Sequence, residues 1–244
     1  MSSVSLVNLC RGRRLAWTAI HDTWLAAGSE QFLAILLPQL LILWVLARWS
    51  ARAVRAALPE ARLLAPLLQD PHWLSLVSVG VIYVLALDFG TYVAHVALHR
   101  VSILWPFHAV HHEAPVLTPL TASRAHPVGL VTVAFVQSAI AGAILGVWIS
   151  LGANTVTYPR LLGTNMLLFG FRAMFACLRH SPRPMPFGRL DAVLVSPSMH
   201  QLHHSRDRAF YGRNYGVVLS IWDRRFGISA SVSRTRARLH RPLS

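Results

Sequence analysis

Histidine is the residue type in this sequence with the greatest capacity for chemistry, and eight of the 13 histidines form three clusters. One pair is four residues apart, and two copies of the pattern HxxHH follow it. Residues three or four apart share one face of a helix, whereas adjacent residues diverge by about 100°. One HxxHH helix can therefore offer imidazoles to two neighbouring metal ions. The clustered residues are His95, His99, His108, His111, His112, His200, His203 and His204.

The clustering favours metal binding over a purely structural role. Packed imidazoles repel one another once protonated, and a metal ion avoids this repulsion because it binds the neutral form. The clusters contain no cysteine, and imidazole suits iron, zinc, copper or nickel. A structural zinc site needs roughly four ligands, and the clustered histidines exceed that number. Two metal ions, each with an open coordination position, therefore fit the sequence better. Cys10 and Cys177 are too few for an iron–sulfur cluster.

The composition indicates a membrane protein. Apolar residues make up 54% of the 244-residue chain and charged residues 13%, whereas soluble domains carry about 25% charged residues. All 23 basic residues are arginine, and nine acidic residues leave a net charge of +14. Such a charge is typical of proteins that bind nucleic acid or an anionic membrane surface. The long apolar segments favour the membrane, and we expect no nucleic-acid partner.

Four apolar segments predict an all-α, multi-pass helical bundle, because about 20 apolar residues cross a bilayer. They cover residues 31–47, 73–99, 128–152 and 158–178. Pro38 lies in the first segment, where proline would kink the helix. We predict two regions, an N-terminal segment with the first span and an interfacial loop (1–70) and a catalytic membrane domain (71–244).

The order of the segments places the histidines on one side of the membrane. The second segment would be roughly 40 Å long as a helix against a hydrocarbon core of about 30 Å, so His95 and His99 can emerge from the lipid. The third segment then leaves that side and the fourth returns to it, which brings His180 and the C-terminal region there. Most arginines lie on the same side, which predicts that the metal-binding cap is cytoplasmic. The expected location is a bacterial inner membrane, or the endoplasmic reticulum of a eukaryote.

Six motifs in order resemble the fatty acid hydroxylase/sterol desaturase superfamily, from about Asp88 to Gly227. They read DFGTYVAHVALHR, LWPFHAVHHEAP, SRAHP, SPSMHQLHHSRD, NYG and WDRRFG. The resemblance implies a helical membrane fold with a cytosolic cap, two iron ions, O2 as co-substrate and an external supply of electrons. Residues 1–70 carry no comparable motif.

The resemblance also implies the ligands, which are the eight clustered histidines together with His126 and His180. We expect one ion to be held by His95, His108, His111, His200 and His203, and the other by His99, His112, His126, His180 and His204. The sequence departs from its relatives after His180, where Ser181 and Pro182 stand in place of the usual Ser-Asn. That departure puts one polar contact near the metals in doubt.

Polar residues near the motifs have two interpretations each. Asp88 lies two helical turns before His95, so it could orient an imidazole or pair with a buried arginine. Arg172 could pair with Asp88 or extend towards the membrane interface. The C-terminal motif residues Asn214, Tyr215, Trp222 and Asp223 are expected to anchor the cap.

The predicted function is an O2-dependent di-iron oxidoreductase that hydroxylates or desaturates a C–H bond of a lipid or sterol-like substrate. Two alternatives stay open: the same scaffold could cleave a C–C or ether bond of a lipid, or the chain could be a non-enzymatic zinc-binding membrane protein. There is no GxGxxG motif after a strand and no cysteine cluster, so a separate reductase or carrier must deliver electrons. Arg206 and Arg208 are expected to dock an acidic carrier.

Overall fold

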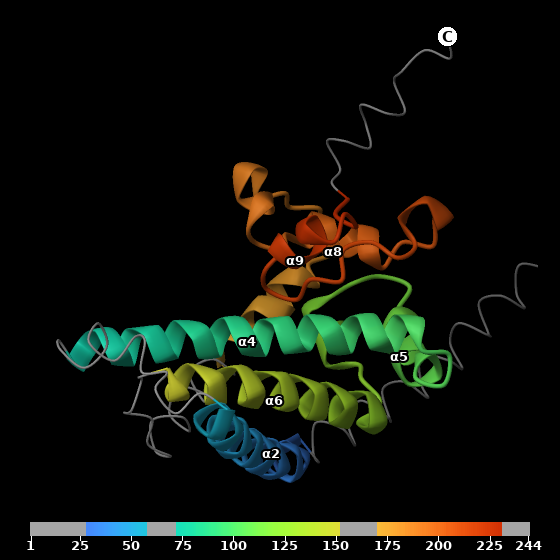
Figure 1. Cartoon of the computed structure of the whole chain (residues 1–244). Coiled ribbons are helices and arrows are strands. Elements are labelled where there is room, and N and C mark those ends of the chain that lie inside the picture. The colour runs from blue at the N-terminus through green and yellow to red at the C-terminus, as the bar shows by residue number, and fades with distance from the viewer. Residues whose placement is uncertain (1–27, 58–71, 152–169, 231–244) are drawn as a thin grey trace, which may run out of the picture. The chain divides into compact units, whose positions relative to one another are not determined.

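The computed structural model describes residues 28–57, 72–151 and 170–230 (Figure 1). All helices and turns in these ranges fit the expected all-α class, and the one β-type pairing there is an isolated bridge between Leu194 and Leu219. The expected interfacial loop (58–71) and the first part of the fourth segment (158–169) lie outside the described residues. His21, His240 and Cys10 also lie outside them.

The longer helices are α2 (Gly28–Ala57), α4 (His72–Arg100) and α6 (Pro127–Ser150), and residues 170–179 are also helical. The shorter ones are α5 (Trp105–His112), α8 (Pro197–His203) and α9 (Ile221–Arg225), with 3-10 turns η1 (Pro119–Ser123), η2 (Gly188–Ala192) and η3 (Arg208–Phe210). The chain divides into two compact units at residues 38 and 39, and every clustered histidine belongs to the second.

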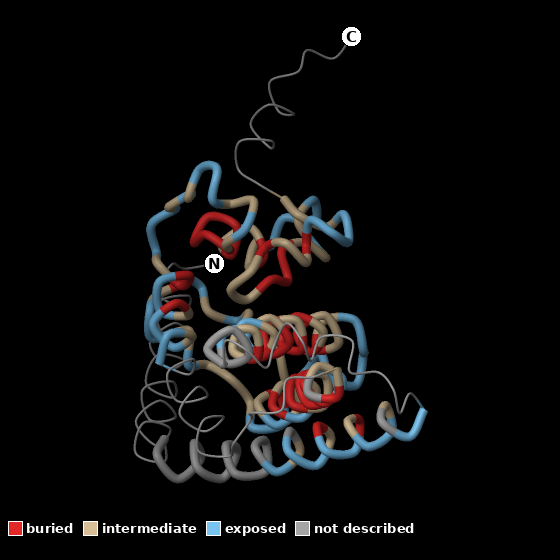
Figure 2. Tube along the Cα trace, turned by 60° about the vertical axis from the view of Figure 1, so that its left-hand side comes forward, coloured by how far each residue is buried: buried red, intermediate tan, exposed pale blue. Residues whose placement is uncertain are grey.

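Two helices are long and apolar enough to cross a membrane by length and composition, Val77–Arg100 in α4 and Pro127–Trp148 in α6. Figure 1 shows α4 and α6 side by side. Their backbones approach closely at Gly90, where an added Cβ would lie 2.6 Å from Cα of Gln137. Ala94 of α4 and Ala141 of α6 are fully buried, and buried positions (red in Figure 2) recur along both helices. Small residues therefore allow the two helices to pack tightly.

Polar side chains between the helices form hydrogen bonds with one another. Thr91 of α4 donates to Oε1 of Gln137 in α6 at 2.8 Å. Arg172 donates to Oγ1 of Thr91 at 2.6 Å and to Oε1 of Gln137 at 3.2 Å. The guanidinium of Arg172 is thus held inside the bundle by two neutral acceptors, and it interacts with Asp88 electrostatically without a direct ion pair within the described residues.

Asp88 joins α4 to the C-terminal region. Its carboxylate accepts hydrogen bonds from the backbone N–H groups of Val218 and Leu219 and from Nε1 of Trp222. With these three donors Asp88 does not orient an imidazole within the described residues, so that expectation was wrong. Its expected arginine partner, Arg172, interacts with it electrostatically but forms no direct ion pair there.

The C-terminal motif anchors the cap, as predicted. Asp223 in α9 accepts the backbone N–H groups of Tyr215 and Gly216, both at 2.8 Å. The Asn214 side chain donates to the carbonyls of Met199 and Ala230 and accepts from the N–H of Ala230. These buried contacts connect α8, α9 and the end of the described chain into one region.

Candidate metal centre

Four elements supply the histidines. His95 and His99 lie on α4, and His180 follows the helix at residues 170–179. The HxxHH patterns form α5 and α8, as expected from the prolines at their starts. Ser196 caps α8 by accepting the N–H of Met199, also as predicted, and α5 ends at His112, before Pro115.

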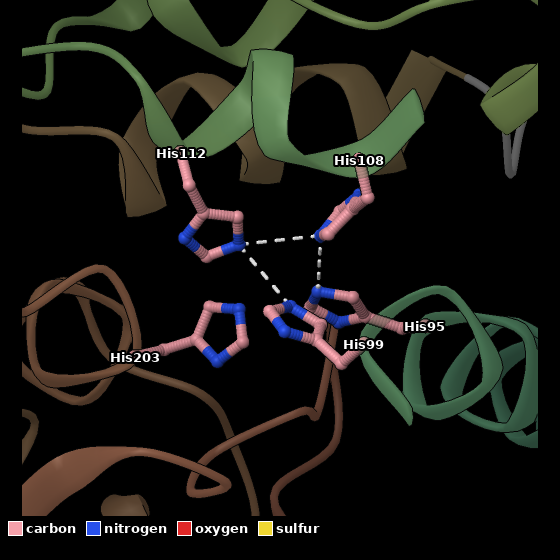
Figure 3. Close-up of side chains that lie close together, drawn as sticks. All are labelled: His95, His99, His108, His112 and His203. Carbon is pink, nitrogen blue, oxygen red and sulfur yellow. Dashed lines mark hydrogen bonds between the residues drawn. The ribbon is translucent and has the colours of Figure 1, made fainter. Parts of the chain in front are cut away.

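Five histidines converge in a first group, which consists of His95, His99, His108, His112 and His203. One ring nitrogen of each lies within 4.8 Å of all the others. Nε2 of His108 is 3.1 Å from Nε2 of His95 and 3.3 Å from Nε2 of His112. Figure 3 shows these rings pointing towards a common centre from α4, α5 and α8.

Four histidines form a second group, which consists of His111, His180, His200 and His204, again with ring nitrogens within 4.8 Å of one another. Nε2 of His200 is 3.0 Å from Nε2 of His180 and 3.1 Å from Nε2 of His204. The two groups are neighbours, because the rings of His112 and His204 stack at 4.2 Å between centroids.

The division between the groups differs from the expected one in which helical positions it pairs. At about 100° per residue, positions i and i+4 are about 40° apart, whereas i and i+3 are about 60° apart. The structure keeps the three i, i+4 pairs together: His95 with His99, His108 with His112, and His200 with His204. The remaining histidine of each HxxHH joins the opposite group, so the expected i, i+3 pairing was wrong.

The structure does not bring His126 into either group. Its Nδ1 accepts the backbone N–H of Val128 at 3.2 Å, and its ring packs against Phe107 with centroids 4.9 Å apart. His126 lies just before α6, and its side chain accepts a backbone hydrogen bond at the start of that helix.

Three backbone carbonyls orient histidines of the two groups. Nδ1 of His95 donates to the carbonyl of Tyr215 at 2.7 Å, Nδ1 of His203 to that of Arg213 at 2.9 Å, and Nδ1 of His111 to that of Arg124 at 3.0 Å. A carbonyl only accepts, so Nδ1 carries the hydrogen and Nε2 keeps its lone pair. Metal-binding histidines are held in this way. Backbone acceptors have no sequence signature, so sequence reasoning missed them.

Asn214 lies in the chain between Arg213 and Tyr215, whose carbonyls accept hydrogen bonds from histidines of the first group. Its φ of 56° makes it the sole non-glycine residue with positive φ in the described ranges. Asparagine tolerates this left-handed conformation better than most residues. Its three side-chain hydrogen bonds hold the turn, and with it the orientation of the Arg213 and Tyr215 carbonyls.

The histidine-bearing part of the chain matches a known family. The fatty acid hydroxylase family model covers residues 80–228. This chain belongs to the fatty acid hydroxylase family. The matched range contains both histidine groups and the cap residues that orient them.

Members of the fatty acid hydroxylase family with assigned functions are similar over the same region. Ornithine lipid hydroxylase OlsE of Rhizobium tropici is 31% identical over 57% of this chain and 38% of its own length. Human alkylglycerol monooxygenase is 32% identical over 59% of this chain and 28% of its own length. Very-long-chain aldehyde decarbonylase GL1-6 of Oryza sativa subsp. indica is 27% identical over 71% of this chain and 26% of its own length. The chain thus spans less than two fifths of each relative, and no solved structure matches it.

Burial keeps the histidines of this member of the fatty acid hydroxylase family neutral. It lowers the pKa of His111 to about 4 and that of His203 to about 4, although a backbone hydrogen bond raises each in part. Burial and then the neighbouring His111 lower the pKa of His108 and of His180 to about 2. At pH 7 these imidazoles therefore present lone pairs without first losing a proton.

Proposed function

We propose that this chain is a membrane-bound di-iron oxygenase that uses O2 and externally supplied electrons to hydroxylate a C–H bond of a lipid. The observation that carries the proposal is the pair of adjacent all-imidazole groups beside two apolar helices long enough to span a membrane. Membership of the fatty acid hydroxylase family supports the same reading.

The residues fit two metal ions. Two imidazoles at right angles on an ion, with bonds of about 2.1 Å, have nitrogens about 3.0 Å apart, and a tetrahedral pair has nitrogens about 3.4 Å apart. The Nε2–Nε2 separations of 3.0 to 3.3 Å lie in this range. Nε2 of His203 is buried with no hydrogen-bond partner among the described residues, as a ligand atom of the first group would be.

The first group would hold one ion and the second group the other. Five and four imidazoles both leave a six-coordinate ion with an open position, which a closed structural zinc site lacks. Bound iron would supply the activation of O2 and the oxidation of the substrate. The chain itself holds the imidazoles neutral and fixes the tautomers of His95, His111 and His203 through backbone carbonyls.

The proposed substrate class is based on the names of the similar proteins and on the apolar helices beside the histidine groups. The names of the similar proteins refer to an ornithine lipid, an alkylglycerol and a very-long-chain aldehyde. A lipid would reach the groups from the apolar helices α4 and α6. We place the site on the cytoplasmic side of a bacterial inner membrane or of the endoplasmic reticulum, because most arginines flank the histidine-bearing side.

A second candidate is oxidation of an alkylglycerol at the carbon beside its ether oxygen, which would cleave the ether bond. The similarity to alkylglycerol monooxygenase favours it. Incubation of the reduced protein with O2 and either an acyl lipid or an alkylglycerol separates the two: a hydroxylated lipid supports the first reading, and a fatty aldehyde supports the second.

The primary test is the metal content of protein purified in mild detergent from iron-supplemented cells. We expect two irons per chain and O2 consumption that depends on lipid and reductant. His200→Ala should lose one iron and all activity, whereas His126→Ala should retain both irons. Zinc that persists under iron loading, together with no O2 consumption, would support the non-enzymatic zinc-binding reading instead.

We propose that a separate protein supplies the electrons and that the exposed Arg206 and Arg208 on the cap attract an acidic carrier. The double substitution Arg206→Glu/Arg208→Glu should slow reduction of the irons at low salt while the metal content stays constant. Arg189→Glu, at another exposed position of the cap, is the matched control. Equal reduction rates in all three proteins would exclude this docking site.

A further inference from the structure

The turn η1 and its flanking residue orient two of the four histidines of the second group. Arg124, which follows η1, provides the carbonyl for His111, as described above. Thr121 of η1 contacts His180, with 3.0 Å between Oγ1 and Nδ1. Thr121 belongs to none of the quoted motifs, and no pattern in the sequence singles it out.

The hydrogen bonds of Thr121 determine the tautomer of His180. A hydroxyl has one hydrogen to donate and two lone pairs. Oγ1 donates its hydrogen to the carbonyl of Thr118 at 2.7 Å, and it accepts the backbone N–H of Thr118 at 3.0 Å. The remaining lone pair faces His180, and with the Thr121 hydrogen on the Thr118 carbonyl, Nδ1 of His180 is the donor to it.

This tautomer determines the state of Nε2, on the other side of the His180 ring. With its hydrogen on Nδ1, His180 keeps the lone pair of Nε2, which lies 3.0 Å from Nε2 of His200 inside the second group. His180 is 1% exposed, so water does not compete for this contact. We propose that Thr121 is a positioning residue whose hydroxyl holds His180 as a ligand of the second metal ion. This assignment rests on the proposed function.

The contact that orients His180 can be removed by a substitution, whereas the contacts that orient His95 and His203 in the first group cannot. His95 and His203 are held by backbone carbonyls, which a substitution cannot remove, whereas His180 depends on a side chain. Loss of the hydrogen-bond partner of a ligating histidine commonly weakens metal binding about 10- to 100-fold. Thr121→Val removes the hydroxyl at almost constant volume, and Thr121→Ser keeps it.

The experiment titrates the metal-free protein with Co²⁺ in detergent and follows the absorption of the bound ion. A His99→Ala background weakens the first group, so that binding to the second group is measured by itself. In that background we expect Thr121→Val to raise the dissociation constant about 10- to 100-fold and Thr121→Ser to restore it. Ser123→Ala removes a hydroxyl from the same turn that contacts no histidine, and it should bind Co²⁺ like the parent.

Three outcomes would overturn the assignment. They are equal Co²⁺ affinity of Thr121→Val and its parent, an equal loss in Thr121→Ser, or an equal loss in Ser123→Ala. If the unmutated protein binds no Co²⁺, the proposed metal centre fails as well, which separates that failure from a failure of Thr121 alone.

A second measurement needs no substitution at Thr121. In the metal-free protein labelled with ¹⁵N-histidine, the His180 signals, assigned by their loss in His180→Gln, should be those of the tautomer with hydrogen on Nδ1. The opposite tautomer would overturn the assignment even if Thr121→Val did not fold.

Discussion

Nε1 of Trp222 in α9 donates to the carboxylate of Asp88 in α4 at 2.8 Å, which joins residues 134 positions apart. The same carboxylate accepts two backbone N–H groups of the loop before α9. Because α4 also carries His95 and His99, this contact holds the cap and the first histidine group to the same helix. The cap is therefore joined to α4 through the buried carboxylate of Asp88.

Trp222→Phe removes the indole donor and keeps an aromatic ring. A hydrogen bond to a charged group contributes about 1.5–3 kcal/mol, so we expect the free energy of unfolding to fall by about that amount. Denaturant unfolding in detergent measures it. Trp49→Phe, at a tryptophan that is 67% exposed, is the matched control and should have little effect. An equal loss in both variants would show that the contact with Asp88 is not the cause.

The grouping of the histidines predicts separate metal losses. His99→Ala should lose the ion of the first group and retain the second, and His200→Ala should do the reverse. Both should abolish O2-dependent activity, because the proposed reaction needs both ions. Elemental analysis and iron spectroscopy of each variant measure the result. If His99→Ala and His200→Ala altered the same spectroscopic component, the grouping would be wrong.

The metal-free protein should lose stability as the pH falls from about 6.5 to about 4. The pKa values of His111 and His203 are lowered to about 4 in the folded chain, whereas a histidine in an unfolded chain titrates near 6.5. In this window the unfolded state binds protons that the folded state does not, so the free energy of unfolding decreases with decreasing pH. Unfolding at pH 7, 6 and 5 measures this effect.

Buried acidic residues act in the opposite direction. Burial raises the pKa of Asp223 to about 6, so the folded state binds a proton there before the unfolded state does. The histidines with lowered pKa values outnumber the buried carboxyls, and the net effect should still be a loss of stability. Stability that stays constant or rises down to pH 5 would contradict the prediction.

Gly90 allows the close approach of α4 and α6. An alanine there would place Cβ against the backbone of Gln137, and overpacking of this kind costs about 1–3 kcal/mol. Gly80→Ala in the same helix is the control, because an added Cβ meets no atom within 4 Å. Thermal unfolding should separate the two variants, and similar melting temperatures would show that the helices can move apart without cost.

Much of the site could be predicted from sequence, because helical spacing alone brings histidines together. The spacing of His95 and His99 and of the two HxxHH patterns indicated the shared faces, and Ser196 and Pro197 indicated the start of α8. The division into groups could not be predicted in the same way. Both i+3 and i+4 positions lie on one face, and the choice between them depends on how α5 and α8 are rotated about their axes.

The roles of single polar residues were harder to predict. Asp88 was expected to serve a histidine or an arginine, but it accepts donors from a loop about 130 positions away, and chain spacing does not reveal such contacts. The same holds for Arg172, whose acceptors lie on α4 and α6. His126 has a favourable sequence context, yet it lies at the start of α6 rather than within a group.

The adjacent pairs His111–His112 and His203–His204 each contribute one residue to either group, with ring centroids 5.6 Å and 5.4 Å apart. The two groups are therefore linked at two points by a single peptide unit, while their other histidines reach them from α4 and from His180. A shift of α5 or α8 would displace residues of both groups together. The spacing of the two groups is thus limited by the covalent chain as well as by the packing of the helices.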